Sequence, residues 1–189
     1  MSVRLQKKLP IDRIEFVGGR LCLDFVNTAN WVDGNPLDER LADMSAIAMW
    51  TARQGIAGLH PPGGRIEEFL ELRCVIHRVL SDPENATSRD LAVLNRVRMG
   101  KPAPLSKTNG GLKLLPKQRS DWLRRLLADS AVEVALTVKP ERLKTCSGDH
   151  CGWMFVDESP NNRRRWCSMA TCGNRAKAKR HYAVIKNSG

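Results

Sequence analysis

Apolar residues recur every three or four positions through much of the first 139 residues, which is the periodicity of helices that bury one face. The pattern predicts helices over residues 20–31, 43–54, 66–81, 87–97 and 120–136. Residues 103–115 are strand-like on both sides of Asn109-Gly110-Gly111, a turn sequence that predicts a β-hairpin. We therefore expect residues 1–139 to form a mainly helical domain with one hairpin.

Two of these helices carry recognisable end signals. Asp43 is placed to cap the first turn of the helix over 43–54, and Gly55 can end it in the left-handed conformation. Thr87 or Ser88 can cap the helix that begins there.

The pattern changes after Pro140, which we take as the boundary to a second domain, residues 140–189. Residues 143–155 are expected to form a short hairpin, residues 157–162 a polar loop, and residues 174–185 a helix. A hairpin, a second pair of cysteines and a helix, in that order, suggest a treble-clef-like zinc finger. The predicted fold class is therefore α+β and mainly α.

Four cysteines in this second domain have the spacing of a metal site. Cys146, Cys151, Cys167 and Cys172 follow the pattern C-x4-C-x15-C-x4-C. Tetrahedral zinc takes four such ligands as two short-spaced pairs, and four thiolates leave no position open for water. We expect one structural Zn²⁺ that contributes folding free energy to a segment with little core of its own. His150, beside Cys151, is an alternative fourth ligand.

Two disulfides would explain the same four cysteines. They require an oxidising compartment, whereas the first ten residues carry charge and lack the apolar stretch of a secretory signal. No apolar run approaches the ~20 residues of a membrane helix. The expected location is the cytoplasm, where zinc is favoured over disulfides.

Charge is distributed unevenly along the chain. The formal net charge is +11, and the last 51 residues contain 11 basic and 4 acidic residues. A concentration of positive charge of this kind indicates a phosphate-bearing partner.

Two motifs resemble a known family. The sequence Cys172-Gly173-Asn174-Arg175, preceded by the arginine run and Trp166, resembles the CGNR zinc finger. Residues 16–28 are similar to the opening of the ABATE domain that accompanies this finger. The resemblance implies a stress-induced bacterial transcription regulator that binds DNA through the finger.

The basic residues of the second domain are the candidate DNA contacts. They are Arg163, Arg164 and Arg165 before the second cysteine pair, and Arg175, Lys177, Lys179 and Arg180 on the following helix. Arginine matches phosphate oxygens and guanine edges, and no aromatic run typical of RNA-binding sheets is present. The alternative is a zinc-stabilised protein-interaction module without direct DNA binding. Regulators that read paired half-sites are often homodimers, although no heptad pattern is present here.

The first domain contains a candidate effector site. Asp24, Asn27 and Thr28 are spaced to share one face of the first predicted helix, with Arg20 one turn earlier. Such convergent polar groups could bind a small molecule. Alternatively, Asp24 pairs with Arg20, and Asn27 and Thr28 satisfy backbone groups at the helix end.

Enzymatic chemistry has little support in the sequence. The glycine pair Gly18-Gly19 lacks the rest of a phosphate-binding loop, and the four histidines have no paired metal spacing. We expect the protein not to be an enzyme.

Overall fold

The computed structural model describes residues 7–56, 62–99, 104–114 and 121–187. Its α-helices are α1 (Leu21–Val26), α2 (Met44–Arg53), α3 (Ile66–Ser81), α4 (Ser88–Arg98), α5 (Trp122–Thr137) and α6 (Asn174–Asn187). Its strands are β1 (Lys7–Lys8), β2 (Ala29–Val32), β3 (Asn35–Glu39), β4 (Leu105–Thr108), β5 (Gly111–Leu114), β6 (Leu143–Thr145) and β7 (Met154–Val156). This mainly helical architecture with small sheets confirms the predicted fold class.

The helix ends that were predicted from capping residues agree with the structure. The Asp43 carboxylate accepts hydrogen bonds from the N–H groups of Ser45 and Ala46 at 2.9 and 3.0 Å, and Gly55 has a φ of +69°. Thr87 caps α4 by accepting from the N–H of Asp90 at 3.1 Å. The β4–β5 hairpin is also confirmed within 104–114, while residues 103, 115 and 120 of the predictions lie outside the described residues.

The helix predicted over residues 20–31 is wrong in its second half. Helix α1 ends at Val26, and Ala29–Val32 form β2, which pairs with β3 in antiparallel fashion. The burial of β2 alternates, so its apolar side chains have the period of a strand. Asp33 and Gly34 between the strands have φ of 49° and 72°, the conformation that an Asp-Gly hairpin turn requires.

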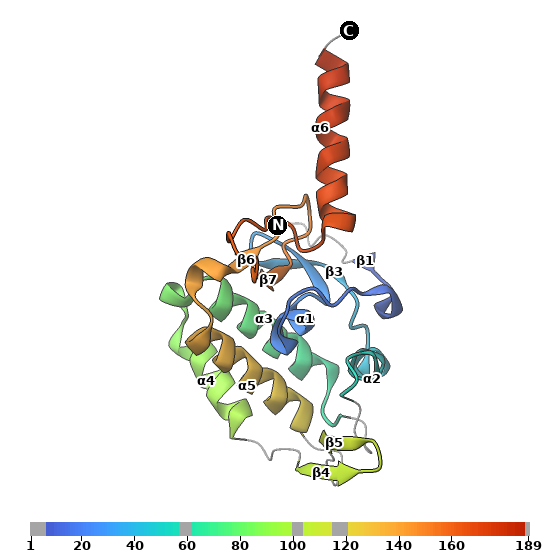
Figure 1. Ribbon diagram of the computed structural model, residues 1–189. Coiled ribbons are helices and arrows are strands. Elements are labelled where there is room, and N and C mark those ends of the chain that lie inside the picture. The colour runs from blue at the N-terminus through green and yellow to red at the C-terminus, as the bar shows by residue number, and fades with distance from the viewer. Residues whose placement is uncertain (1–6, 57–61, 100–103, 115–120, 188–189) are drawn as a thin grey trace.

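Helices α1, α4 and α5 pack around α3. In Figure 1, α4 and α5 lie beside α3 on one side, and α1 lies next to it on the side of the small sheet. Phe25 contacts the rings of Trp50 and Phe69 edge-on, with centroids 5.5 and 6.4 Å apart. All three side chains are completely buried and form the centre of the core.

The same buried core continues into the C-terminal segment. Met154 and Phe155 of β7 are at most 1% exposed and belong to one cluster with the core residues of the helical domain. The β6–β7 hairpin is therefore seated on the helical domain through apolar contact. Among the described residues, no helix has the length and apolar character needed to cross a membrane.

A buried polar cluster lies between α3 and the β2–β3 hairpin. Arg73 of α3 donates to Glu39 at 2.7 Å and to the Thr28 hydroxyl at 2.9 Å. His77, one turn further along α3, stacks on Trp31 with ring centroids 3.7 Å apart. Burial, and then the charges of Arg78 and Arg73, lower the pKa of His77 from 6.5 to about 4.

This histidine should make stability depend on pH. Its proton affinity is lower in the folded state, so its stabilising contribution is complete above the unfolded pKa of 6.5 and decreases as the pH falls toward about 4. We expect the wild-type free energy of unfolding to fall by about 1 kcal/mol more than that of His77→Gln between pH 7.5 and pH 5.5. Urea unfolding at the two pH values measures this difference. The exposed His181 supplies the control, since His181→Gln should retain the wild-type pH dependence.

Candidate metal centre and nucleic-acid interface

The four finger cysteines converge on one point. Their sulfur atoms all lie within 4.8 Å of one another, and all four residues are buried. The Sγ atom of Cys167 is 3.6 Å from those of Cys151 and Cys172. Four sulfurs at 2.3 Å from a zinc ion lie about 3.8 Å apart, so the observed spacing fits tetrahedral zinc. The cysteines form one structural zinc site, as predicted.

Short segments of backbone hold the sulfurs in place. The Cys146 sulfur accepts from the N–H groups of Gly148 and Cys167 at 3.4 and 3.3 Å. Side-chain hydrogen bonds from Cys151 and Cys167, followed by these backbone donors, lower the pKa of Cys146. Gly148 is needed for close approach, because a Cβ there would lie 3.0 Å from the Cys172 sulfur. These contacts bring the backbone of both cysteine pairs close to the cluster of sulfur atoms.

Arg175 is attached to the metal centre. Its guanidinium donates to the Cys172 sulfur at 3.2 Å, and this hydrogen bond raises the pKa of Arg175. Four thiolates around one zinc ion carry net negative charge, which the guanidinium offsets. His150 lies outside the group of clustered ligand atoms.

The loop predicted only as polar is organised around a buried carboxylate. Asp157 accepts from Lys144 Nζ at 2.6 Å and from the N–H groups of Ser159 and Arg164 at 2.9 and 2.8 Å. Burial alone would raise the pKa of Asp157, but these hydrogen bonds outweigh it and hold the pKa well below its usual range. The side chain therefore fixes the start of the arginine run.

The three arginines of the run, residues 163–165, do not all point to the surface. Arg164 is half-buried, with its guanidinium 4.2 Å from the Phe155 ring centroid and donating to the carbonyls of Val17 and Trp166 at 3.1 and 3.0 Å. Arg163 and Arg165 are exposed. The structure thus places Arg164 between the finger and the helical domain, and its two neighbours at the surface.

Helix α6 extends away from the rest of the molecule. Figure 1 shows it projecting from the finger at the end opposite the β4–β5 hairpin. Its exposed side chains include Lys177, Lys179 and Arg180. Lys179 forms an ion pair at 2.5 Å with Asp149, which lies in the zinc knuckle, the loop between Cys146 and Cys151. The helix contains no acidic residue. Positive charge is therefore the main chemical property of this surface.

The candidate effector residues make separate contacts. Asp24 accepts from the Gly18 N–H at 2.8 Å, and Arg20 pairs with Glu158 at 3.0 Å rather than with Asp24. Burial raises the pKa of Asp24, although the Gly18 hydrogen bond opposes the shift. Thr28 accepts from Arg73 and donates to the Phe25 carbonyl, which places it in the buried cluster described above.

Asn27 joins the two domains. Its amide accepts from the Met154 N–H at 2.8 Å and donates to the Met154 carbonyl at 2.9 Å, so it pairs with β7 as another strand would. The Val156 N–H likewise donates to the Gly18 carbonyl at 3.0 Å. Three of the four candidates, Arg20, Asn27 and, through Gly18, Asp24, thus lie at or beside the contact with the finger.

The contact between the finger and the helical domain includes further residues that the sequence did not indicate. The Trp31 N–H donates to the Cys151 carbonyl at 2.9 Å, and the Trp153 indole donates to Asn30 at 3.0 Å. Gly152 has a φ of 63°, and a Cβ there would lie 2.2 Å from the Trp31 carbonyl oxygen. A glycine directly after a metal ligand was the available signal.

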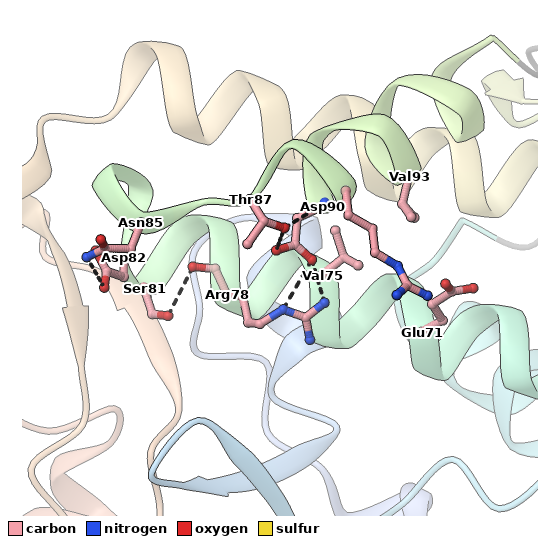
Figure 2. A pocket seen from close by; sticks show the side chains of 10 residues that line it. Glu71, Val75, Arg78, Ser81, Asp82, Asn85, Thr87, Asp90 and Val93 are labelled. Atoms are coloured by element: carbon pink, nitrogen blue, oxygen red, sulfur yellow. Dashed lines mark hydrogen bonds and ion pairs between the residues drawn. The ribbon is translucent and has the colours of Figure 1, made fainter.

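A hollow between α3 and α4 is the other candidate for a small-molecule site. It has a volume of about 440 Å³, and Figure 2 shows that most of the labelled polar side chains in it pair with each other. Arg78 reaches Asp90 at 2.5 Å, which lowers the pKa of that carboxyl, and Asn85 donates to Asp82 at 2.9 Å. These pairs satisfy most of the polar groups that would recognise a ligand.

Fold and site together define a zinc-finger protein whose four-cysteine finger is built onto a helical domain. The chain belongs to the ABATE family, described as "Putative stress-induced transcription regulator", which matches residues 19–138. The CGNR zinc finger matches residues 142–183. No curated protein sequence matches the chain. Both predicted resemblances are confirmed, in the predicted order.

Proposed function

We propose that the protein is a transcription regulator that binds duplex DNA through the finger, with α6 entering the major groove. The observation that carries this proposal is α6 itself, which has five basic residues, no acidic residue and exposed cations along its length. The major groove of B-DNA is wide enough for one α-helix. At 1.5 Å per residue its 14 residues extend about 21 Å, enough to follow the groove past several base pairs.

The placement of the cations supports contacts to both DNA strands. Lys177 and Lys186 are nine residues apart, so they lie on opposite sides of the helix, as phosphates on either side of a groove would require. Arg163 and Arg165 add exposed charge beside the helix start. In this proposal Arg164 and Arg175 hold the finger together and do not contact DNA. Four cysteines that form one metal site rather than two disulfides suit the reducing cytoplasm.

A protein-interaction role is favoured by one observation. Tyr182 and Ile185, exposed to 70% and 55%, form an apolar stripe with Ala178 on α6. A partner with an apolar groove and an acidic rim would match this helix. Binding to such a partner would survive the loss of DNA affinity described next.

The test is fluorescence anisotropy with a labelled duplex at two salt concentrations. We expect the logarithm of the affinity to fall about 0.9 per phosphate contact against the logarithm of salt. Replacing Lys177 and Lys186 by Gln should weaken binding about tenfold or more and reduce this slope by about 1.8. Folding should be unaffected, because both side chains are exposed.

The matched control is Arg89→Gln with Arg96→Gln on α4. Both arginines are exposed, and the double variant changes the net charge equally, at a site away from α6 in Figure 1. Equal losses in the two double variants would show only a general charge effect. Binding that does not depend on salt would contradict the proposal.

A further inference from the structure

A second hollow lies where α6 leaves the zinc knuckle. Its volume is about 490 Å³, and its lining includes Arg165 and Trp166 on one side and Arg175, Lys179 and Arg180 of α6 on the other. Volumes of this size are typical of small-molecule sites. The hollow therefore has the size and the enclosure to hold a ligand rather than to make a surface contact only.

Its charge is strongly positive. Four of the lining side chains are cationic, and the one acidic side chain, Asp149, already pairs with Lys179. Arg175 is held by the Cys172 sulfur. The guanidinium of Arg180 is exposed and has no hydrogen bond or ion pair with the described residues, so it is available to an anion.

Its aromatic wall is Trp166, the one partly exposed residue among the five tryptophans, all of which the structure describes. Trp31, Trp50, Trp122 and Trp153 are each at most 9% exposed, whereas Trp166 is half-buried. The Arg165 guanidinium lies 5.5 Å from the centroid of the Trp166 ring. A planar base can stack on an indole of this kind, and arginine beside it can bind a phosphate.

We propose that this hollow binds a nucleoside phosphate, with the base on Trp166 and the phosphate between Arg165 and Arg180. Neither cations alone nor an aromatic ring alone would select this class, but the two together match the two parts of a nucleotide. The nucleotide is either free, as a small-molecule effector, or an unpaired nucleotide of a DNA strand. The inference does not depend on duplex binding by α6, which is tested separately at Lys177 and Lys186, two residues that do not line the hollow.

The experiment is fluorine NMR on the full, zinc-loaded chain labelled with 5-fluorotryptophan. The sequence contains five tryptophans, and Trp166→Phe assigns the resonance of interest. Adenosine 5′-monophosphate should shift the Trp166 resonance, with adenosine and inorganic phosphate each binding more weakly. A short single-stranded oligonucleotide distinguishes the two sources: a shift with the oligonucleotide but not the mononucleotide assigns the site to DNA.

Arg165→Gln should weaken nucleotide binding about tenfold, the effect of losing one charge-assisted hydrogen bond. Arg163→Gln is the matched control, since Arg163 is exposed in the same loop but does not line the hollow, and it should change binding less than about twofold. Equal effects of the two variants, equal binding of phosphate and nucleotide, or no shift of Trp166 with either nucleotide probe would each overturn the proposal. Duplex affinity, measured separately, reports on α6 alone through the Lys177 and Lys186 variant.

Discussion

Removal of zinc is expected to unfold the finger and to destabilise the helical domain with it. Structural zinc in small fingers contributes about 10 kcal/mol or more of folding free energy at neutral pH. Here the finger is also part of the main core, because Phe155 is completely buried in the cluster that contains Phe25. A chelator titration followed by far-UV circular dichroism and urea unfolding should therefore show a lower midpoint for the whole chain.

A cysteine outside the cluster provides the control for this prediction. Cys172→Ser removes one ligand and should lower the urea midpoint as chelation does. Cys74 is half-buried and lies outside the group of clustered ligand atoms, so it is suited to packing rather than to metal binding. Cys74→Ser should leave zinc content unchanged. If the chelated protein kept its wild-type midpoint, the finger would be an independent appendage and our interpretation of the joint core would be wrong.

The parts of the fold that could be predicted are those determined by residues close to one another in the sequence. Asp43 caps α2 through neighbours two and three residues away, so the sequence contains all that the cap needs. The β2–β3 hairpin was missed although Asp33-Gly34 is itself a turn signal. Leu21 and Phe25 have helical spacing, and the helical interpretation was extended through residues whose burial in fact alternates.

The metal ligands were predictable for the same reason, whereas their surroundings were not. Each cysteine pair spans six residues, and its spacing restricts the coordination geometry. Asn27 pairs with Met154, 127 residues away, and Arg164 reaches Val17, 147 residues away. No periodicity in one sequence encodes such partners. Composition likewise does not distinguish one arginine from another, whereas the structure places Arg164 against the Phe155 ring and leaves Arg163 and Arg165 exposed.

Substitution of Arg73 should have the second-largest effect on stability. Its side chain is 1% exposed and pairs with Glu39, which is itself 9% exposed at the side chain. Arg73→Met leaves the carboxylate buried without its partner, and removing one member of such a pair costs about 3–5 kcal/mol. Arg89→Met on α4 is the control, since Arg89 is exposed and its loss should cost less than about 0.5 kcal/mol.

The substitution Arg73→Met should also lower the zinc affinity of the finger, although Arg73 does not contact the metal ligands. Arg73 binds Thr28 and lies 5.9 Å from the Trp31 ring centroid, and the Trp31 N–H in turn binds the carbonyl of the zinc ligand Cys151. Zinc affinity, measured by chelator competition, should therefore fall in Arg73→Met and remain unchanged in Arg89→Met. Combining Arg73→Met with Glu39→Gln removes the uncompensated charge and should recover part of the stability. If stability is recovered while zinc affinity is not, Arg73 positions the finger through Trp31, and its contribution is not limited to the core.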